Sequence, residues 1–192
     1  MKIIFLDIDG VLNNLYTKET FQGFVFVEDE KILLLKEIIE KTKAEIVLSS
    51  TWRKGWILKS ENPYSSNEDV CLFEALEEKL AEYDIELMGC TEEIGTRGEE
   101  ITEWLENHKE DVESYVILDD ADESEFTWHE NHLVTTSIED GLTMKSVVEA
   151  VSILNERKDE YSADYYNELN DTFGEMVCNW GGDEKNDYFI SL

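Results

Sequence analysis

Acidic and hydroxyl side chains follow three short apolar runs of the chain, at the point where each run ends. In chain order they are Asp7-Ile8-Asp9 after residues 2–6, Ser49-Ser50-Thr51 after residues 44–48, and Asp119-Asp120 after residues 114–118. Short apolar runs of this kind are typical of buried strands in a parallel sheet. Ligands of open parallel sheets bind beyond the carboxyl ends of the strands, so the three sets are expected to converge on one rim.

The converging carboxylates predict a magnesium site. Several carboxylates held close together repel one another and resist ionisation, and a hard cation is the usual remedy. Mg2+ takes oxygen ligands, typically one or two carboxylates together with substrate phosphate and water. The rim therefore predicts Mg2+ as the cofactor and a phosphorylated molecule as the substrate.

The spacing of the two aspartates in the first set indicates a type of reaction. Asp7 and Asp9 are two residues apart at a strand end, so both could face the rim if the backbone turns there. Gly10 permits that turn and the close approach of a ligand. One carboxylate could attack phosphorus and form an aspartyl-phosphate, while the other protonates the leaving oxygen. The alternative is that Asp-Ile-Asp-Gly is an ordinary exit from a strand into a turn.

Strands and helices alternate along the chain. This order predicts an α/β fold, a Rossmann-like three-layer sandwich with a mainly parallel sheet covered by helices on both faces. Further strands are expected at 85–87 and 132–135, and helices at about 30–42, 70–82, 99–108 and 143–156. Residues 1–158 are expected to form this core, and residues 159–192 an acidic C-terminal extension.

The charge of the chain narrows the choice of partners. The sequence has 46 acidic and 16 basic residues, a net charge of 16 − 46 = −30, and 42% hydrophobic residues. The apolar content is too high for a disordered acidic tail. A negative electrostatic field repels polyanions, and the chain offers no basic surface for non-specific binding of phosphates. Long duplex nucleic acid is therefore not expected as a partner.

One basic segment stands against this background. Residues 51–60, TWRKGWILKS, carry Arg53, Lys54 and Lys59 and no acid. They open the stretch of about 52–90, which could hold a small cap or lid beside the site. Either the segment is a solvated loop or it seats an anionic substrate, and in the second case Trp52 or Trp56 could stack on a nucleobase.

Other features point to a cytoplasmic protein without a membrane segment. No apolar run approaches the ~18 residues of a membrane span, and the N-terminal run is broken too early for a signal peptide. The three cysteines fit neither a zinc site nor a disulfide framework. His129 and His132 are three residues apart, but a metal site needs more ligands, so a surface loop is expected there.

The chain resembles the haloacid dehalogenase-like (HAD) hydrolases. FLDIDGVLN resembles the first signature of that superfamily, an apolar strand followed by Asp-x-Asp-Gly. Its other motifs are matched in order by Ser49 in EIVLSSTW, Arg97 in GTRGEEITEWL, and Asp119 and Asp120 in YVILDDAD. The resemblance covers about residues 1–155. The residues around these motifs are also similar to those of a small HAD branch associated with RNA-repair proteins.

The resemblance implies a role for each matched residue at the reacting phosphate. Asp7 would be the nucleophile and a magnesium ligand. Asp9 would be the general acid and base and lend its backbone carbonyl to the metal. Ser49 would bind the transferring phosphoryl group, with Ser50 as the alternative. Arg97 would neutralise its oxygens.

The resemblance also implies the rest of the site. Asp119 would bind magnesium, and Asp120 would do so directly or through water. Arg53 or Lys54 is the alternative to Arg97 as the cationic group, and Gly10 and Arg53 are expected to contact the substrate. An Asp two residues after the nucleophile is typical of the phosphatases of the family and absent from its dehalogenases.

The sequence thus predicts a Mg2+-dependent phosphohydrolase that acts through an aspartyl-phosphate. Its substrate is expected to be a phosphorylated small molecule, a nucleotide or the terminal phosphate of a nucleic acid. The alternative is a non-catalytic acidic binding or regulatory protein on the same fold. The oligomeric state stays open.

Overall fold

The computed structural model describes residues 1–155 of the chain. The predicted acidic extension, residues 159–192, lies outside the described residues. Within them, no helix is long and apolar enough to cross a membrane.

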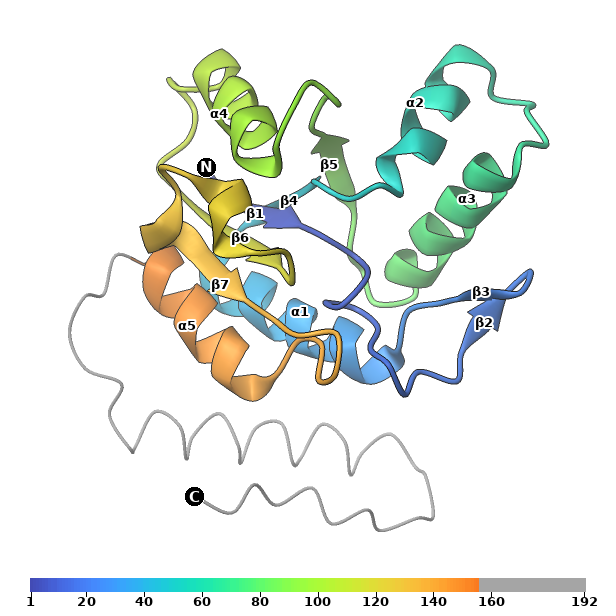
Figure 1. Cartoon of the computed structure of the whole chain (residues 1–192), viewed down its shortest axis with the longest axis horizontal. Helices are drawn as coiled ribbons and strands as arrows, with labels where there is room; N and C mark the ends of the chain where they lie inside the picture. Colours follow the sequence, from blue (N-terminus) through green and yellow to red (C-terminus); the bar gives the residue numbers. More distant parts are fainter. Residues whose placement is uncertain (156–192) are drawn as a thin grey trace, which may run out of the picture. The chain divides into compact units, whose positions relative to one another are not determined.

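A five-stranded sheet forms the centre of the described part (Figure 1). Its strands are β1 (Lys2–Leu6), β4 (Glu45–Leu48), β5 (Leu87–Cys90), β6 (Ser114–Asp119) and β7 (Leu133–Thr135). Their order is β5-β4-β1-β6-β7, and every neighbouring pair is parallel. The predicted α/β fold with a Rossmann-like parallel sheet is therefore confirmed.

Helices cover both faces of this sheet. Helices α1 (Asp29–Thr42) and α5 (Met144–Leu154) pack against each other beneath the sheet in Figure 1, and α4 (Arg97–Asn107) lies on the other face. Helices α2 (Arg53–Glu61) and α3 (Glu68–Ala81) pack against each other between β4 and β5 in the chain. Two 3₁₀ turns, η1 (Glu123–Phe126) and η2 (Glu130–His132), precede β7, and a small hairpin of β2 (Thr20–Phe21) and β3 (Phe24–Val25) precedes α1.

The core between the sheet and α4 follows from strand alternation. Ile3 and Phe5 of β1 point to the same face and pack in one buried cluster with Ile101 of α4 and Phe126 of η1. The Phe5 ring also meets Trp104 of α4 edge to face, with ring centroids 5.3 Å apart. This packing fixes α4 over the strands whose ends carry the polar residues.

The structure differs from the sequence prediction at the edge of the fold. Residues 53–61 form helix α2, which the sequence did not predict. Its sequence has no apolar periodicity, because the helix buries only Arg53 and Gly55. A Cβ atom at Gly55 would collide with the backbone carbonyl of Asp69 in α3, so glycine allows the two helices to pack closely. The strand expected at 85–87 begins instead at Leu87, since Ile85 closes the turn after α3 with a bond to the Leu80 carbonyl.

Candidate active site

Three of the predicted polar residues lie side by side at the carboxyl rim of the sheet. The strand ladder continues one residue beyond the strands: the Asp7 amide donates to the Leu118 carbonyl at 3.0 Å, and the Ser49 amide to the Leu6 carbonyl at 2.9 Å. The Asp119 carbonyl accepts from the Thr136 amide at 2.9 Å. Each residue is therefore held by the backbone of its neighbouring strand.

Three carboxylates gather at this rim. Asp7, Asp119 and Asp120 each offer an oxygen atom within 4.8 Å of the others. Asp7 and Asp119 are only 5% and 1% exposed, and the buried Oδ2 atom of Asp119 has no hydrogen-bond partner. A buried carboxylate oxygen without a donor, beside two other carboxylates, is an arrangement that a cation would satisfy.

Burial disfavours the ionised form of all three, and charge repulsion between carboxylates adds to it. Burial raises the pKa of Asp7, although the Arg97 guanidinium opposes the rise. Burial and then the Asp7 charge raise the pKa of Asp119 to about 7. Burial also raises the pKa of Asp120. The three residues fit Mg2+, which prefers oxygen ligands and would compensate the charge they bury together.

Arg97 is the cation that the fold brings to these carboxylates. Its Nη2 atom lies 3.5 Å from Asp7 Oδ1, and its Nη1 atom 3.7 Å from Asp119 Oδ2. It occupies the first turn of α4, which begins with a capping box between Thr96 and Glu99. Because the buried Nη1 atom has no hydrogen-bond partner, the guanidinium keeps a donor available for an anion.

The two serines after β4 differ in their contacts. Both are fully buried, but the Ser49 hydroxyl has no hydrogen-bond partner. A hydrogen bond from the Ser50 side chain lowers the pKa of Asp7, in opposition to the effect of burial. Ser49 therefore has a free hydroxyl at the rim, whereas the hydroxyl of Ser50 is engaged with the carboxylate.

Asp9 and Gly10 complete the turn after β1. Gly10 has a φ of +70°, and a Cβ atom there would collide with the Asp120 carboxylate, so the turn requires glycine. The Asp9 side chain is exposed, and both of its oxygens accept hydrogen bonds. Oδ1 accepts from Asn13 Nδ2 at 2.9 Å and Oδ2 from Trp52 Nε1 at 3.0 Å.

Arg53 lies in a different environment from the one predicted. Its side chain is buried, its Nη1 atom donates to Thr91 Oγ1 at 3.0 Å, and its Nη2 atom pairs with Glu100 Oε1 at 2.8 Å. The expectation that Arg53 binds the substrate is not supported, because its charge is already paired in the interior. Lys54, the next residue, is exposed.

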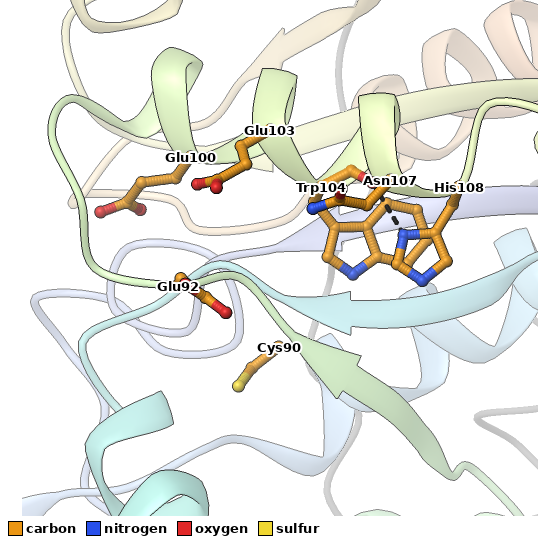
Figure 2. A pocket seen from close by; sticks show the side chains of 7 residues that line it. All are labelled: Cys90, Glu92, Glu100, Glu103, Trp104, Asn107 and His108. Carbon is orange, nitrogen blue, oxygen red and sulfur yellow. Dashed lines mark hydrogen bonds between the residues drawn. The ribbon is translucent and has the colours of Figure 1, made fainter.

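A separate pocket of about 180 Å³ lies between β5 and α4. Figure 2 shows Glu100, Glu103 and the stacked rings of Trp104 and His108 on its α4 side, with Glu92 and Cys90 opposite. None of the residues at the strand rim lines this pocket. Its lining is acidic, which makes it a poor receptor for a phosphate.

Two residues that contact the rim were not anticipated from the sequence. Trp52 was expected to be a core or lid aromatic that could stack on a base; it is 8% exposed, and its indole N–H donates to Asp9, a contact that the sequence did not indicate. Asn13 is buried and contacts the same carboxylate. The position of Trp52 two residues after the serine pair is the one available sequence signal, since Asn13 follows the first motif without a recognisable pattern.

Comparison with known proteins identifies a family to which most of the chain is similar. No curated protein matches the chain. Residues 3–147 match the model of a protein family described as "HAD domain in Swiss Army Knife RNA repair proteins". The matched range includes all of the rim residues described above.

Proposed function

The chain belongs to the family of HAD domains in Swiss Army Knife RNA repair proteins, and from this we propose that it is a Mg2+-dependent phosphohydrolase that works through an aspartyl-phosphate on Asp7. The observation that carries the proposal is the arrangement around that carboxylate. Asp7 contacts Arg97, a free Ser49 hydroxyl lies on the neighbouring strand end, and Asp119 and Asp120 are within reach of one cation.

The first half of the reaction transfers the phosphoryl group to the protein. An Asp7 carboxylate oxygen attacks phosphorus, and the bond between phosphorus and the leaving oxygen breaks. The Asp9 carboxyl group gives its proton to that oxygen, which departs as an alcohol. Ser49 and Arg97 donate hydrogen bonds to the phosphoryl oxygens as charge develops on them.

The second half returns the protein to its starting state. Asp9, now a carboxylate, takes a proton from a water molecule that attacks phosphorus. The bond between phosphorus and the Asp7 oxygen breaks, which releases inorganic phosphate and restores the Asp7 carboxylate. Asp9 is protonated again and ready for the next substrate.

Mg2+ would be held by Asp7, Asp119 and Asp120, with the backbone carbonyl of Asp9 as a further ligand. When bound, it neutralises the carboxylates and the phosphoryl oxygens, which is the electrostatic contribution that phosphoryl transfer requires. The burial of Asp119 and its raised pKa support this assignment, because without a cation one of the carboxylates is held partly protonated near neutral pH.

The proposed substrate is a nucleotide or the terminal phosphate of a nucleic acid. The family description names RNA repair proteins, which supports a nucleic-acid end. The net charge of −30 supports a short or single-ended contact instead of a long duplex. We also propose a cytoplasmic location, because Cys71 and Cys90 are free thiols among the described residues.

The enzyme proposal is tested by the hydrolysis of an aryl phosphate with and without Mg2+. We expect turnover that requires the metal and is abolished by Asp7→Asn, which keeps the shape of the side chain but removes the nucleophile. Lys109→Ala is a matched control, since this exposed residue follows helix α4 and has no role in the proposed site. If no metal-dependent turnover exceeds that of Asp7→Asn across pH and a panel of phosphates, the enzyme proposal is wrong.

The substrate class is tested by competition. Nucleotides and oligonucleotides with 5′- or 3′-terminal phosphates are compared with sugar phosphates at equal concentration. We expect the nucleotide substrates to be preferred by kcat/KM. Equal values for all of them would remove the nucleic-acid assignment and leave a general phosphatase.

The second candidate is a non-catalytic acidic protein that binds a basic partner. The observation in its favour is the net charge of −30, which suits a basic surface better than a phosphate. It predicts that wild-type protein and Asp7→Asn behave alike in the aryl phosphate assay, so the same experiment separates the two candidates.

A further inference from the structure

Asp9 moves the protons in the proposed reaction, and the side chains of Trp52 and Asn13 hold its carboxyl group in the turn after β1. The indole N–H of Trp52 donates to Asp9 Oδ2 at 3.0 Å, and the Asn13 amide donates to Oδ1 at 2.9 Å. We propose that Trp52 is a positioning residue that fixes the orientation of the Asp9 carboxyl group toward the leaving oxygen. This inference rests on the proposed phosphohydrolase function.

The two hydrogen bonds determine how the carboxyl group can turn. A carboxylate offers about four lone-pair positions, two on each oxygen. Trp52 and Asn13 use one position on each oxygen, so rotation about the Cβ–Cγ bond would break both contacts. Asp9 is exposed, and without these donors its side chain would exchange between rotamers. Proton transfer to a departing oxygen depends on such orientation.

Packing presets the direction of the Trp52 donor. The residue lies between the serine pair and the first turn of α2 and is 8% exposed. The Phe26 ring packs on the indole, with centroids 6.1 Å apart, and Phe21 of the β2–β3 hairpin packs on Phe26 at 5.8 Å. The indole is therefore held from the side of the hairpin, and its buried N–H finds a partner in Asp9.

The second donor is fixed by the turn itself. Asn13 Oδ1 accepts from the Gly10 amide at 3.0 Å, which directs the amide nitrogen toward Asp9. This bond belongs to the backbone turn that follows the first motif. Trp52 comes from the second motif, so Asp9 is held by contacts from both sides of the rim.

The consequence depends on the leaving group. An alkyl alkoxide is a poor leaving group and needs the proton of Asp9, whereas an activated aryl oxide departs with little help. A positioned general acid contributes about 10²–10⁴-fold to such steps. Loss of the Trp52 donor should therefore reduce kcat/KM most for alkyl phosphates, because kcat/KM includes the departure of the leaving group.

The test uses Trp52→Phe, which keeps an aromatic ring and removes the N–H. We expect kcat/KM for alkyl phosphates to fall about tenfold or more, and for a nitrophenyl phosphate by a clearly smaller factor. Trp52→His, which returns a ring N–H, is expected to recover part of the difference. Trp56→Phe is the matched control from the helix that follows Trp52, because its ring packs against Phe73 of α3, and it should leave the leaving-group dependence unchanged.

A second measurement does not depend on how the Trp52 variants fold. In the full chain, the indole ¹⁵N–¹H resonance of Trp52 should lie further upfield in Asp9→Ala, which lacks the acceptor, than in the wild-type protein, while that of Trp56 stays in place. An unmoved Trp52 resonance would overturn the contact. An equal loss for alkyl and aryl phosphates in Trp52→Phe would overturn the positioning role. Absence of turnover in the wild-type protein would instead contradict the proposed function, and the resonance would still report on the contact.

Discussion

At the scale of single residues, the rim is organised by a conflict between burial and charge. Asp7 and Asp119 are almost completely buried next to each other, and within residues 1–155 Arg97 is the one cation that pairs with both at less than 4 Å. The pKa of Asp119 is consequently raised to about 7. A protein that keeps such a cluster gives up stability in the metal-free state, and metal binding can recover it.

We predict that Asp119→Asn stabilises the metal-free protein at pH 8. The wild-type carboxyl has a higher pKa in the folded state than in the unfolded state, so its contribution is favourable below about pH 4 and is lost as the pH rises through about 7. The gain is on the order of a few kcal/mol, since each pKa unit corresponds to about 1.4 kcal/mol. Urea unfolding at pH 8 and pH 4 in EDTA measures it.

The same variant separates charge relief from metal binding. Added Mg2+ should raise the melting temperature of the wild-type protein and have little effect on Asp119→Asn. A similar rise in both proteins would show that the cation binds elsewhere. A variant less stable than the wild-type protein at pH 8 without metal would contradict the electrostatic account.

At the scale of elements, α4 is fixed by two polar clusters as well as by its apolar face. On one side, Glu100 pairs with Arg53 of α2 at 2.8 Å, and both side chains are buried. On the other, buried His129 is near the Gly98 carbonyl and Thr102 through Nε2 and near the Tyr115 hydroxyl through Nδ1. Because α4 begins with Arg97, both clusters bear on the position of that guanidinium.

We predict that Arg53→Ala reduces stability more than it affects substrate affinity. Removing one partner of a buried ion pair leaves the other uncompensated, which typically costs about 3–5 kcal/mol. Chemical unfolding should show a loss of this size, and the double variant Arg53→Met with Glu100→Leu should recover much of it. A normal free energy of unfolding with a selectively raised KM for nucleotides would restore Arg53 to the substrate site.

We predict that His129 makes stability fall in mild acid. Burial lowers its pKa below the usual 6.5, so its contribution is present above about pH 6.5 and is lost as the pH falls through the lower value of the folded state. The Gly98 carbonyl can only accept, so the neutral ring carries its proton on Nε2 and accepts from Tyr115 at Nδ1.

The measurement is the free energy of unfolding at pH 7 and pH 5 in the wild-type protein and in His129→Gln. The variant should be less stable at pH 7 and should lose less on acidification. An identical change with pH in both proteins would assign the acid sensitivity to other groups.

The elements that carry the rim could be predicted from the sequence, and the contacts that support it could not. Apolar runs identify the ends of β1, β4 and β6, and therefore Asp7, Ser49 and Asp119. Helix α2 was not predicted because its sequence has no apolar stripe. Arg53 was expected to contact the substrate because its partner, Glu100, lies 47 residues away in the chain and leaves no local signal of an ion pair. Long-range pairing of polar groups leaves no periodic signal.

At the scale of the whole molecule, the net charge bears on how the proposed substrate would approach the rim. Residues 1–96 carry 20 acidic and 10 basic side chains, a net of −10, and residues 97–192 carry 26 and 6, a net of −20. Such a field repels a phosphorylated substrate until it reaches Arg97 and the proposed metal. Salt should relieve this repulsion, because the Debye length is only ~10 Å at 0.1 M.

We predict that the preference for long over short nucleic-acid substrates increases with ionic strength. The ratio of kcat/KM for a long oligonucleotide phosphate to that for a mononucleotide should rise with KCl at constant free Mg2+. Proteins that hold nucleic acid through many phosphate contacts show the opposite trend. A falling ratio would reveal a basic track that binds the strand.

The buried pair of Arg53 and Glu100 also limits how this chain can be recombined. Arg53 opens the segment between the second and third motifs, whereas Glu100 belongs to helix α4, which follows that segment. A chimaera that replaced residues 52–90 without an arginine at the first turn would leave a buried carboxylate without a counter-charge. A segment that replaces residues 52–90 should therefore carry an arginine that pairs with Glu100, or Glu100 should be replaced at the same time.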